Sequence, residues 1–173
     1  MNGTNHLAFG TTVSIMTVLN MDMLANTIPN IPNTTEMKTL IILGGVIGSL
    51  LPDIDNPTGH VGKLCAPVSN IFGAIHKLQG KEVWQHRGIM HDLSVYIIGL
   101  IFSYLFFLPI FGIFLGGITH LLLDMFNPAG VPVFLGMGKV RLGYVKSNDK
   151  TATYITVILC VISVLIGAFI YKI

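Results

Sequence analysis

Apolar residues fall into five runs along the chain, and polar or proline-containing stretches separate these runs. A helix that crosses a membrane needs roughly 20 predominantly apolar residues. The unbroken run Thr151 to Tyr171 meets this requirement and predicts a lipid-facing anchor helix. The run Asn5 to Leu24 contains hydroxyl, amide and carboxyl side chains, which predicts a helix shielded from lipid by other parts of the protein. The run Lys38 to Leu51 is short for a span, so we expect a short or re-entrant helix there.

Pro109 lies in the middle of a long apolar stretch, residues 92–127, and predicts two antiparallel helices. Proline cannot donate a backbone hydrogen bond and disfavours helical angles at the residue before it. Asp92 lies 17 residues before Pro109 and Asp124 lies 15 residues after it. These separations correspond to about 25 Å and 22 Å of helix. We therefore expect the acidic ends of the two arms to return to the same depth.

Two features of the remaining segments predict packing and turns. Small residues at four-residue spacing in the run from Lys38, such as Gly44 and Gly48, let helices approach closely in a membrane. Pro52 ends that run, and residues 53–59 have turn composition with two carboxylates. The loop 60–85 contains an apolar patch, residues 68–75, which predicts a helix lying on the surface.

The composition is that of an integral membrane protein. Hydrophobic residues make up 52% of the 173 residues, whereas charged residues make up only 10%. We expect an all-α fold: an integral membrane bundle of about five transmembrane or membrane-embedded helices in a single domain, residues 1–173. Its parts would be a bundle over about 5–127, a basic loop over 128–150 and an anchor helix over 151–171. A net charge of only +2 predicts no direct nucleic-acid partner.

Basic residues are concentrated in the loops beside the histidine-rich end of the predicted bundle. They are Lys63, Lys77, Lys81, Arg87, Lys139, Arg141, Lys146 and Lys150, against Lys38 and Lys172 at the other end. An excess of lysine and arginine in short loops marks the cytoplasmic side. Residues 1 to 5 carry no basic residue, so we expect no cleaved signal peptide. The sequence thus predicts a multi-pass protein of the cell membrane, with the N-terminus and the histidine-rich end in the cytoplasm.

Imidazole and carboxylate side chains gather at that predicted end. The candidates are His6, Asp53, Asp55, His86, His91, Asp92, His120 and Asp124. This set, without sulfur, suits zinc and also manganese or iron. A catalytic zinc commonly takes three protein ligands, so the surplus predicts either two metal ions or additional groups acting as general base and as ligand-orienting carboxylates. Arg87, next to His86, would suit an anionic oxygen of a substrate.

Each pair also has a purely structural interpretation. His120 and Asp124, four residues apart on one helical face, could form a hydrogen-bonded pair that packs two helices. His91 and Asp92 could cap a helix. The Asp53-Ile54-Asp55 run could be a turn, and His6 taken alone is a weak signal. The coincidence of all these pairs at one depth favours a functional site.

Four ordered motifs carry a resemblance to a known family. They are His6 with the apolar run behind it, Leu50-Leu51-Pro52-Asp53-Ile54-Asp55, His86-Arg87-Gly88-Ile89-Met90-His91-Asp92, and Gly117-Ile118-Thr119-His120-Leu121-Leu122-Leu123-Asp124 with Asn127 and Gly130-Val131 behind it. Together they resemble the YdjM-like family over about residues 6–132. That family is described as metal-dependent hydrolases of the inner membrane, and one member is described as LexA-binding. It is distantly similar to the zinc phospholipase C and P1 nuclease group, helical enzymes whose histidine and aspartate clusters hold zinc ions that cleave phosphodiesters.

The resemblance implies a role for each matching residue. It assigns the metal site to His6, Asp53, His91, Asp92, His120 and Asp124. It adds His86 and Asp55 as further candidates for that site. We predict that Asp55, His86 and Arg87 are the catalytic residues around one or two divalent ions, with zinc the first expectation.

Three functions are compatible with these observations. The first is a membrane-embedded hydrolase that acts on a lipid or lipid-linked phosphoester at the cytoplasmic face. The second is a metal or ion transporter, since intramembrane histidine and aspartate suit an ion pathway equally well. The third is a membrane protein with a structural metal site that recruits a soluble protein partner through its basic loops.

Overall fold

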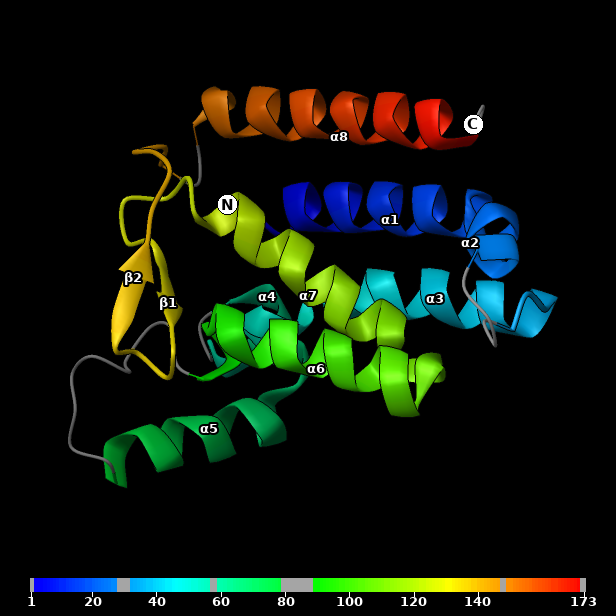
Figure 1. The fold of residues 1–173 in the computed structure, drawn as a ribbon. Helices are drawn as coiled ribbons and strands as arrows, with labels where there is room; N and C mark the ends of the chain where they lie inside the picture. The colour runs from blue at the N-terminus through cyan, green and yellow to red at the C-terminus, as the bar shows by residue number, and fades with distance from the viewer. Residues whose placement is uncertain (1, 28–31, 57–58, 79–88, 147–148, 172–173) are drawn as a thin grey trace.

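The computed structural model describes residues 2–27, 32–56, 59–78, 89–146 and 149–171. Five helices of 14 to 22 residues form a bundle, and the segment 60–78 and a β-hairpin lie at one of its ends (Figure 1). The five are α1 (Gly3–Leu19), α3 (Thr35–Gly48), α6 (Leu93–Phe106), α7 (Phe111–Asp124) and α8 (Lys150–Tyr171). Helix α7 contacts α1, α3 and α6, while α8 packs against α1. Helix α7 therefore occupies the centre of the bundle.

The reversal predicted at Pro109 is present. Helix α6 ends at Phe106, a single 3-10 turn spans Leu108–Ile110, and α7 begins at Phe111. The two helices pack against each other, so the start of α6 and the end of α7 lie at the same end of the bundle.

Helices α3 and α7 pack with their backbones in contact. A β-carbon added at Gly48 would lie 2.0 Å from the carbonyl oxygen of Ile113, and one added at Gly112 would lie 2.3 Å from the carbonyl oxygen of Ile41. A β-carbon at Gly116 would lie 2.2 Å from the carbonyl oxygen of Gly45. The small-residue face predicted for the second run is therefore the α7 contact, and α7 carries a matching row of glycines.

The first apolar run forms two helices, and the prediction of one helix from Asn5 to Leu24 is wrong at its end. Helix α1 ends at Leu19, and α2 (Met21–Thr27) follows after Asn20. The side-chain amide of Asn20 donates to the carbonyl oxygen of Met16, at 2.8 Å. Asparagine side chains compete in this way for backbone hydrogen bonds, which disfavours a continuous helix.

The described chain is mostly helical, as predicted, but the basic loop 128–150 also contains a short β-hairpin that the prediction lacked. Strands β1 (Val131–Val133) and β2 (Gly138–Val140) pair antiparallel, with Val131 opposite Val140. The β-branched valines favour the extended backbone. Val131 is fully buried in a cluster with Tyr96, Leu121 and Met125, which fixes the hairpin to α6 and α7.

The predicted surface helix corresponds to α5 (Ala66–Leu78), which follows the short helix α4 (His60–Leu64). Helices α4 and α5 both contact the 3-10 helix Leu51–Asp55. Residues 79–88, which include the predicted site residues His86 and Arg87, lie outside the described residues.

Helix α8 has 22 residues and a mean hydropathy of 2.5 in its most apolar window. Among the described residues, it is the one helix long and apolar enough to cross a membrane. Most of its large apolar side chains, such as Ile158 and Leu165, are exposed. Leu93–Phe106 and Leu108–Asp124 are apolar but shorter. The cluster of Phe9, Leu123 and Ala152 joins α1, α7 and α8 at the same end as the hairpin.

Candidate metal centre

Four segments far apart in the sequence bring histidine and aspartate together at one end of the bundle. His6 lies in the first turn of α1, and Asp53 lies in the 3-10 helix after α3. His91 ends the 3-10 turn Ile89–His91, just before α6. His120 and Asp124 lie in the last two turns of α7. All except Asp53 are at least 95% buried.

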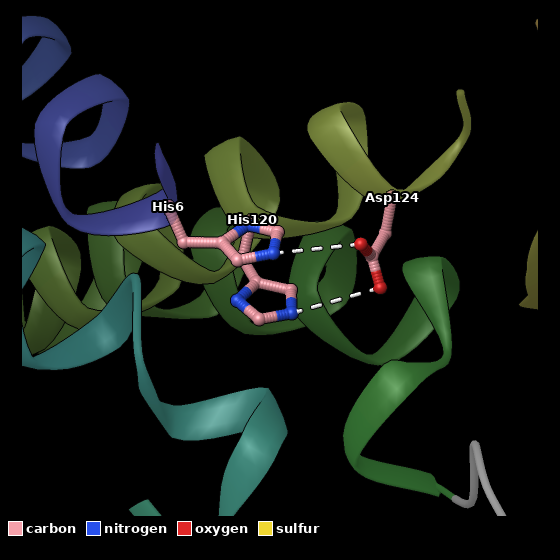
Figure 2. A group of neighbouring side chains, drawn as sticks. All are labelled: His6, His120 and Asp124. Atoms are coloured by element: carbon pink, nitrogen blue, oxygen red, sulfur yellow. Dashed lines mark ion pairs between the residues drawn. The ribbon is translucent and has the colours of Figure 1, made fainter. Parts of the chain in front are cut away.

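His6, His120 and Asp124 form the first group (Figure 2). The two imidazole rings stack with their centroids 3.6 Å apart and their planes 11° apart. The Nε2 atom of His6 lies 3.5 Å from one oxygen of Asp124, and the Nε2 atom of His120 lies 3.8 Å from the other. Two imidazolium cations in this stack would repel each other strongly in a buried site. The stack therefore disfavours a state in which both rings are charged at once, and metal binding requires neutral imidazole.

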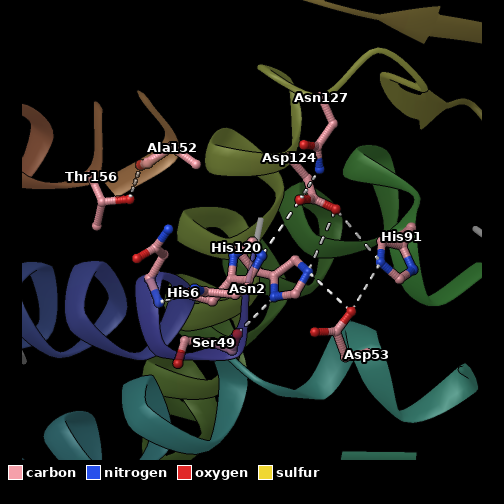
Figure 3. A network of polar contacts seen from close by, with 11 residues as sticks. Asn2, His6, Ser49, Asp53, His91, His120, Asp124, Asn127, Ala152 and Thr156 are labelled. Carbon is pink, nitrogen blue, oxygen red and sulfur yellow. Dashed lines mark hydrogen bonds and ion pairs between the residues drawn. The ribbon is translucent and has the colours of Figure 1, made fainter. Parts of the chain in front are cut away.

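His91, Asp53 and His120 form the second group, which shares His120 with the first. The Nε2 atoms of His91 and His120 lie 3.8 Å and 3.7 Å from the same oxygen of Asp53. His91 Nε2 also lies 3.9 Å from Asp124. In each group the candidate ligand atoms lie within 4.8 Å of one another. Figure 3 shows the three rings and the two carboxylates facing a common centre.

The hydrogen bonds of His120 decide how its ring faces the centre. Its Nδ1 atom lies 2.7 Å from the carbonyl oxygen of Ser49, which can only accept a hydrogen bond, so Nδ1 carries the proton. Nε2 is then an unprotonated acceptor. It is buried, it has no hydrogen-bond partner among the described residues, and it faces the oxygens of Asp53 and Asp124. Acceptors that face each other in a buried site repel unless a cation lies between them, so these residues fit a divalent metal ion.

Two further contacts orient the candidate ligands from behind. The side-chain amide of Asn127 donates to Asp124 Oδ1 at 2.7 Å. Asp55 lies 3.5 Å from Nδ1 of His91, the nitrogen that faces away from the centre. A carboxylate beside the distal nitrogen of a metal-binding histidine fixes the ring and raises its basicity. The structure thus places Asp55 behind His91.

Asp53 marks the open side of the centre. Its side chain is 29% exposed, whereas those of His91, His120 and Asp124 are at most 5% exposed. Burial raises the pKa of Asp53 above that of a free aspartate, and the neighbouring His6 and His91 act in the opposite direction. Among the candidate ligands in the described part of the chain, Asp53 is therefore the one most accessible to water.

Asp92 does not belong to either group of candidate ligands. Its Oδ1 atom accepts from the backbone N–H and the hydroxyl of Ser94, so it caps α6. Its Oδ2 atom accepts from the backbone N–H of Gly136, at 3.1 Å. These contacts make Asp92 a helix cap, which is the structural role that the sequence allowed for it. Asp92 therefore differs in role from His91, the residue before it.

Three groups that lie around the candidate metal centre were not predicted from the sequence. The carbonyl oxygen of Ser49 is a backbone atom and leaves no signal in the residue type. Asn127 gave a weak signal, because it lies three residues after Asp124. Tyr96 is almost fully buried, interacts electrostatically with Asp55 and Asp53, and its hydroxyl has no hydrogen-bond partner among the described residues.

Comparisons with known proteins connect this centre to a family. The family model described as "YdjM inner membrane protein" matches residues 1–172. The chain belongs to the YdjM inner membrane protein family. It is 32% identical over 105 residues to the inner membrane protein YdjM of Escherichia coli (strain K12), and equally to that of Shigella flexneri.

These alignments cover 54% of this chain and 47% of each relative, so the chain matches about half the length of its curated YdjM relatives. No solved structure matches the chain. Family membership agrees with the motifs in the sequence and with the apolar helix α8. The YdjM name states a membrane and no reaction, so the chemistry has to be argued from the centre itself.

Proposed function

We propose that the protein is a membrane-bound, metal-dependent hydrolase that acts on the phosphoester of a lipid or lipid-linked substrate at the cytoplasmic face. The observation that carries this proposal is the orientation of His120. Its protonated nitrogen is bonded to Ser49, and its unprotonated nitrogen faces the carboxylates of Asp53 and Asp124 across a buried space.

The residues that would hold the ion are His6, His91, His120, Asp53 and Asp124. Their nitrogen and oxygen atoms without sulfur suit zinc, and also manganese or iron. A divalent ion bound there would polarise a phosphoryl oxygen and lower the pKa of a coordinated water molecule. Because His120 belongs to both groups, the five residues are compatible with one ion at a shared centre and equally with two adjacent ions.

The remaining residues would position these groups. Asn127 would hold the carboxylate of Asp124, and Asp55 would hold the ring of His91. Asp53, whose side chain is the most exposed of the candidate ligands, would lie where incoming water meets the centre. Arg87 stays a predicted contact for an anionic oxygen of the substrate.

The location of the centre supports a substrate that lies near lipid headgroups. The candidate ligands come from the ends of α1 and α7, from the turn before α6 and from the segment after α3. Transporters usually bind their substrates near the midplane of the membrane, so a centre at the end of the bundle favours hydrolysis over transport. The proposed topology has the five bundle helices embedded in the membrane and the basic loops in the cytoplasm.

The test is hydrolysis by the full-length protein in phosphatidylcholine vesicles that contain phosphatidic acid, a phosphomonoester, or phosphatidylglycerol, a phosphodiester. Zinc-loaded protein should release phosphate or glycerol phosphate, and His120→Ala and Asp124→Ala should reduce release to the background rate. Asp22→Asn is the matched control, because Asp22 is exposed and pairs with Lys38 away from the centre. Hydrolysis that survives both alanine substitutions would eliminate the proposal.

A further inference from the structure

The turn of the β-hairpin exposes large apolar side chains. Phe134, Leu135 and Met137 are 70%, 55% and 89% exposed. No acidic residue occurs between Asp124 and Asp149, so the hairpin and the segment that follows it carry no negative side chain of their own. Large apolar side chains that are exposed together on a protein surface normally contact a partner.

The backbone of the turn holds these side chains outward at an energetic cost. Phe134 and Leu135 have φ angles of 52° and 55°, in the left-handed region that bulky residues rarely adopt. Glycine or asparagine would adopt these angles with less strain. The packing of the protein gains little from either side chain, because both are exposed. Strain at an exposed apolar position is therefore better explained by a contact outside the chain.

Hydrogen bonds fasten the turn to the start of α6. The backbone N–H of Phe134 donates to the hydroxyl oxygen of Ser94, and that of Gly136 donates to Asp92, both at 3.1 Å. Asp92 caps α6 and directly follows His91. The apolar turn is consequently held in a defined position at the same end of the bundle as the metal centre.

The charges beside the turn identify the chemistry of the partner. Lys139, Arg141 and Lys146 are exposed, and the guanidinium of Arg141 lies 4.2 Å from the ring centre of Tyr144. Exposed basic residues beside apolar and aromatic side chains are typical of segments that bind anionic lipid at the membrane interface. Lys146 also lies four residues before Lys150, where the candidate membrane span α8 begins. This continuity keeps the segment close to a membrane surface.

We propose that the hairpin turn, residues 134–137, docks into the headgroup region of an anionic phospholipid bilayer and that Lys139, Arg141 and Lys146 bind the lipid phosphates. The apolar side chains enter the boundary between headgroups and acyl chains, and the basic side chains remain at its surface. Through Asp92 the docked turn would also set the depth of His91 relative to the headgroups. This inference does not depend on whether the metal centre is catalytic.

The experiment places an environment-sensitive probe on the turn of the full-length protein. Met137→Cys, in a background with Cys65→Ala and Cys160→Ala, is labelled with a nitrobenzoxadiazole dye and reconstituted into lipid nanodiscs. Ala129→Cys is the matched control, because Ala129 is exposed in the segment that leads into the hairpin, away from its turn. Interfacial segments bury their apolar face about 5–10 Å deep, so lipids spin-labelled close to the headgroup should quench the probe at position 137 at least about twofold more than at position 129.

Two variants separate the apolar contribution from the charge contribution. Phe134→Asn with Leu135→Asn keeps residues that tolerate the left-handed backbone and should abolish the extra quenching at position 137. Lys139→Gln with Lys146→Gln should reduce the difference between nanodiscs that contain phosphatidylglycerol and nanodiscs of phosphatidylcholine alone.

Three outcomes would overturn the proposal. The first is equal quenching at positions 137 and 129. The second is quenching at position 137 that the double asparagine variant leaves unchanged. The third is a shielded probe that lipid does not quench and that becomes exposed when each nanodisc holds a single copy, which would identify a second copy of the chain as the partner.

Discussion

His6 and His120 stack face to face, and each directs its Nε2 atom at a different oxygen of Asp124. One residue comes from the start of α1 and the other from the end of α7, so the stack joins two helices as well as two candidate ligands. The stacked rings are in contact across the two helices, and both direct a nitrogen at one carboxylate. This relationship leads to a direct test.

Replacing His6 with phenylalanine separates stacking from metal binding. The phenyl ring retains an aromatic face for His120 but has no nitrogen for an ion. We expect His6→Phe to insert normally and to weaken zinc binding at least about 100-fold, which exceeds the typical cost of losing a residue that only orients a ligand. Zinc binding is measured by competition with a chelator, and Leu7→Phe on the exposed side of α1 is the control. Unchanged affinity in His6→Phe would remove His6 from the centre.

Asn127 is expected to support Asp124 without binding the ion. Its amide donates to Asp124 Oδ1, and losing such a contact typically weakens metal binding about 10–100-fold. Asn127→Ala should therefore fall between the wild type and His6→Phe in the same chelator competition. Asn70→Ala, an exposed substitution in α5, should behave as the wild type. An effect as large as that of His6→Phe would mean that Asn127 does more than orient its neighbour.

The close approach of α3 and α7 should control the centre through the carbonyl oxygen of Ser49. A β-carbon at Gly48 would meet the carbonyl of Ile113, so Gly48→Ala forces the helices apart next to Ser49. Overpacking of this kind costs about 1–3 kcal/mol, and we expect both a lower thermal midpoint in detergent and weaker zinc binding. Gly3→Ala is the control, since a β-carbon there has no neighbour within 4 Å. A normal thermal midpoint for Gly48→Ala would contradict the contact.

The topology is tested by labelling single cysteines in intact cells and, to reach the cytoplasmic side, in inside-out membrane vesicles. We expect Met90→Cys and Phe126→Cys, which flank the metal centre, to react with a membrane-impermeant maleimide from the cytoplasmic side only. Asn33→Cys, in the segment between α2 and α3 at the other end of the bundle, should react from outside. Reaction of positions 90 and 126 on different sides of the membrane would contradict both the topology and the centre.

Much of the helical order could be predicted from the sequence. Pro109 marks the reversal between α6 and α7, because proline acts on the backbone whatever surrounds it. The glycine spacing of α3 and the apolar run of α8 are also properties of neighbouring residues. The break at Asn20 was missed because it depends on which backbone carbonyl the side-chain amide bonds. The β-hairpin was missed because it depends on valines packing against distant helices.

By itself, the sequence determined which donor atoms this protein has and near which helix ends they occur. Only the tertiary structure decided their roles. In the folded protein, His120 Nδ1 bonds a backbone carbonyl, Asp92 caps α6, and Asp55 lies beside Nδ1 of His91. The physical reason is that residue type fixes what a side chain can donate or accept. Which lone pair remains available for an ion depends on contacts between segments that only packing brings together.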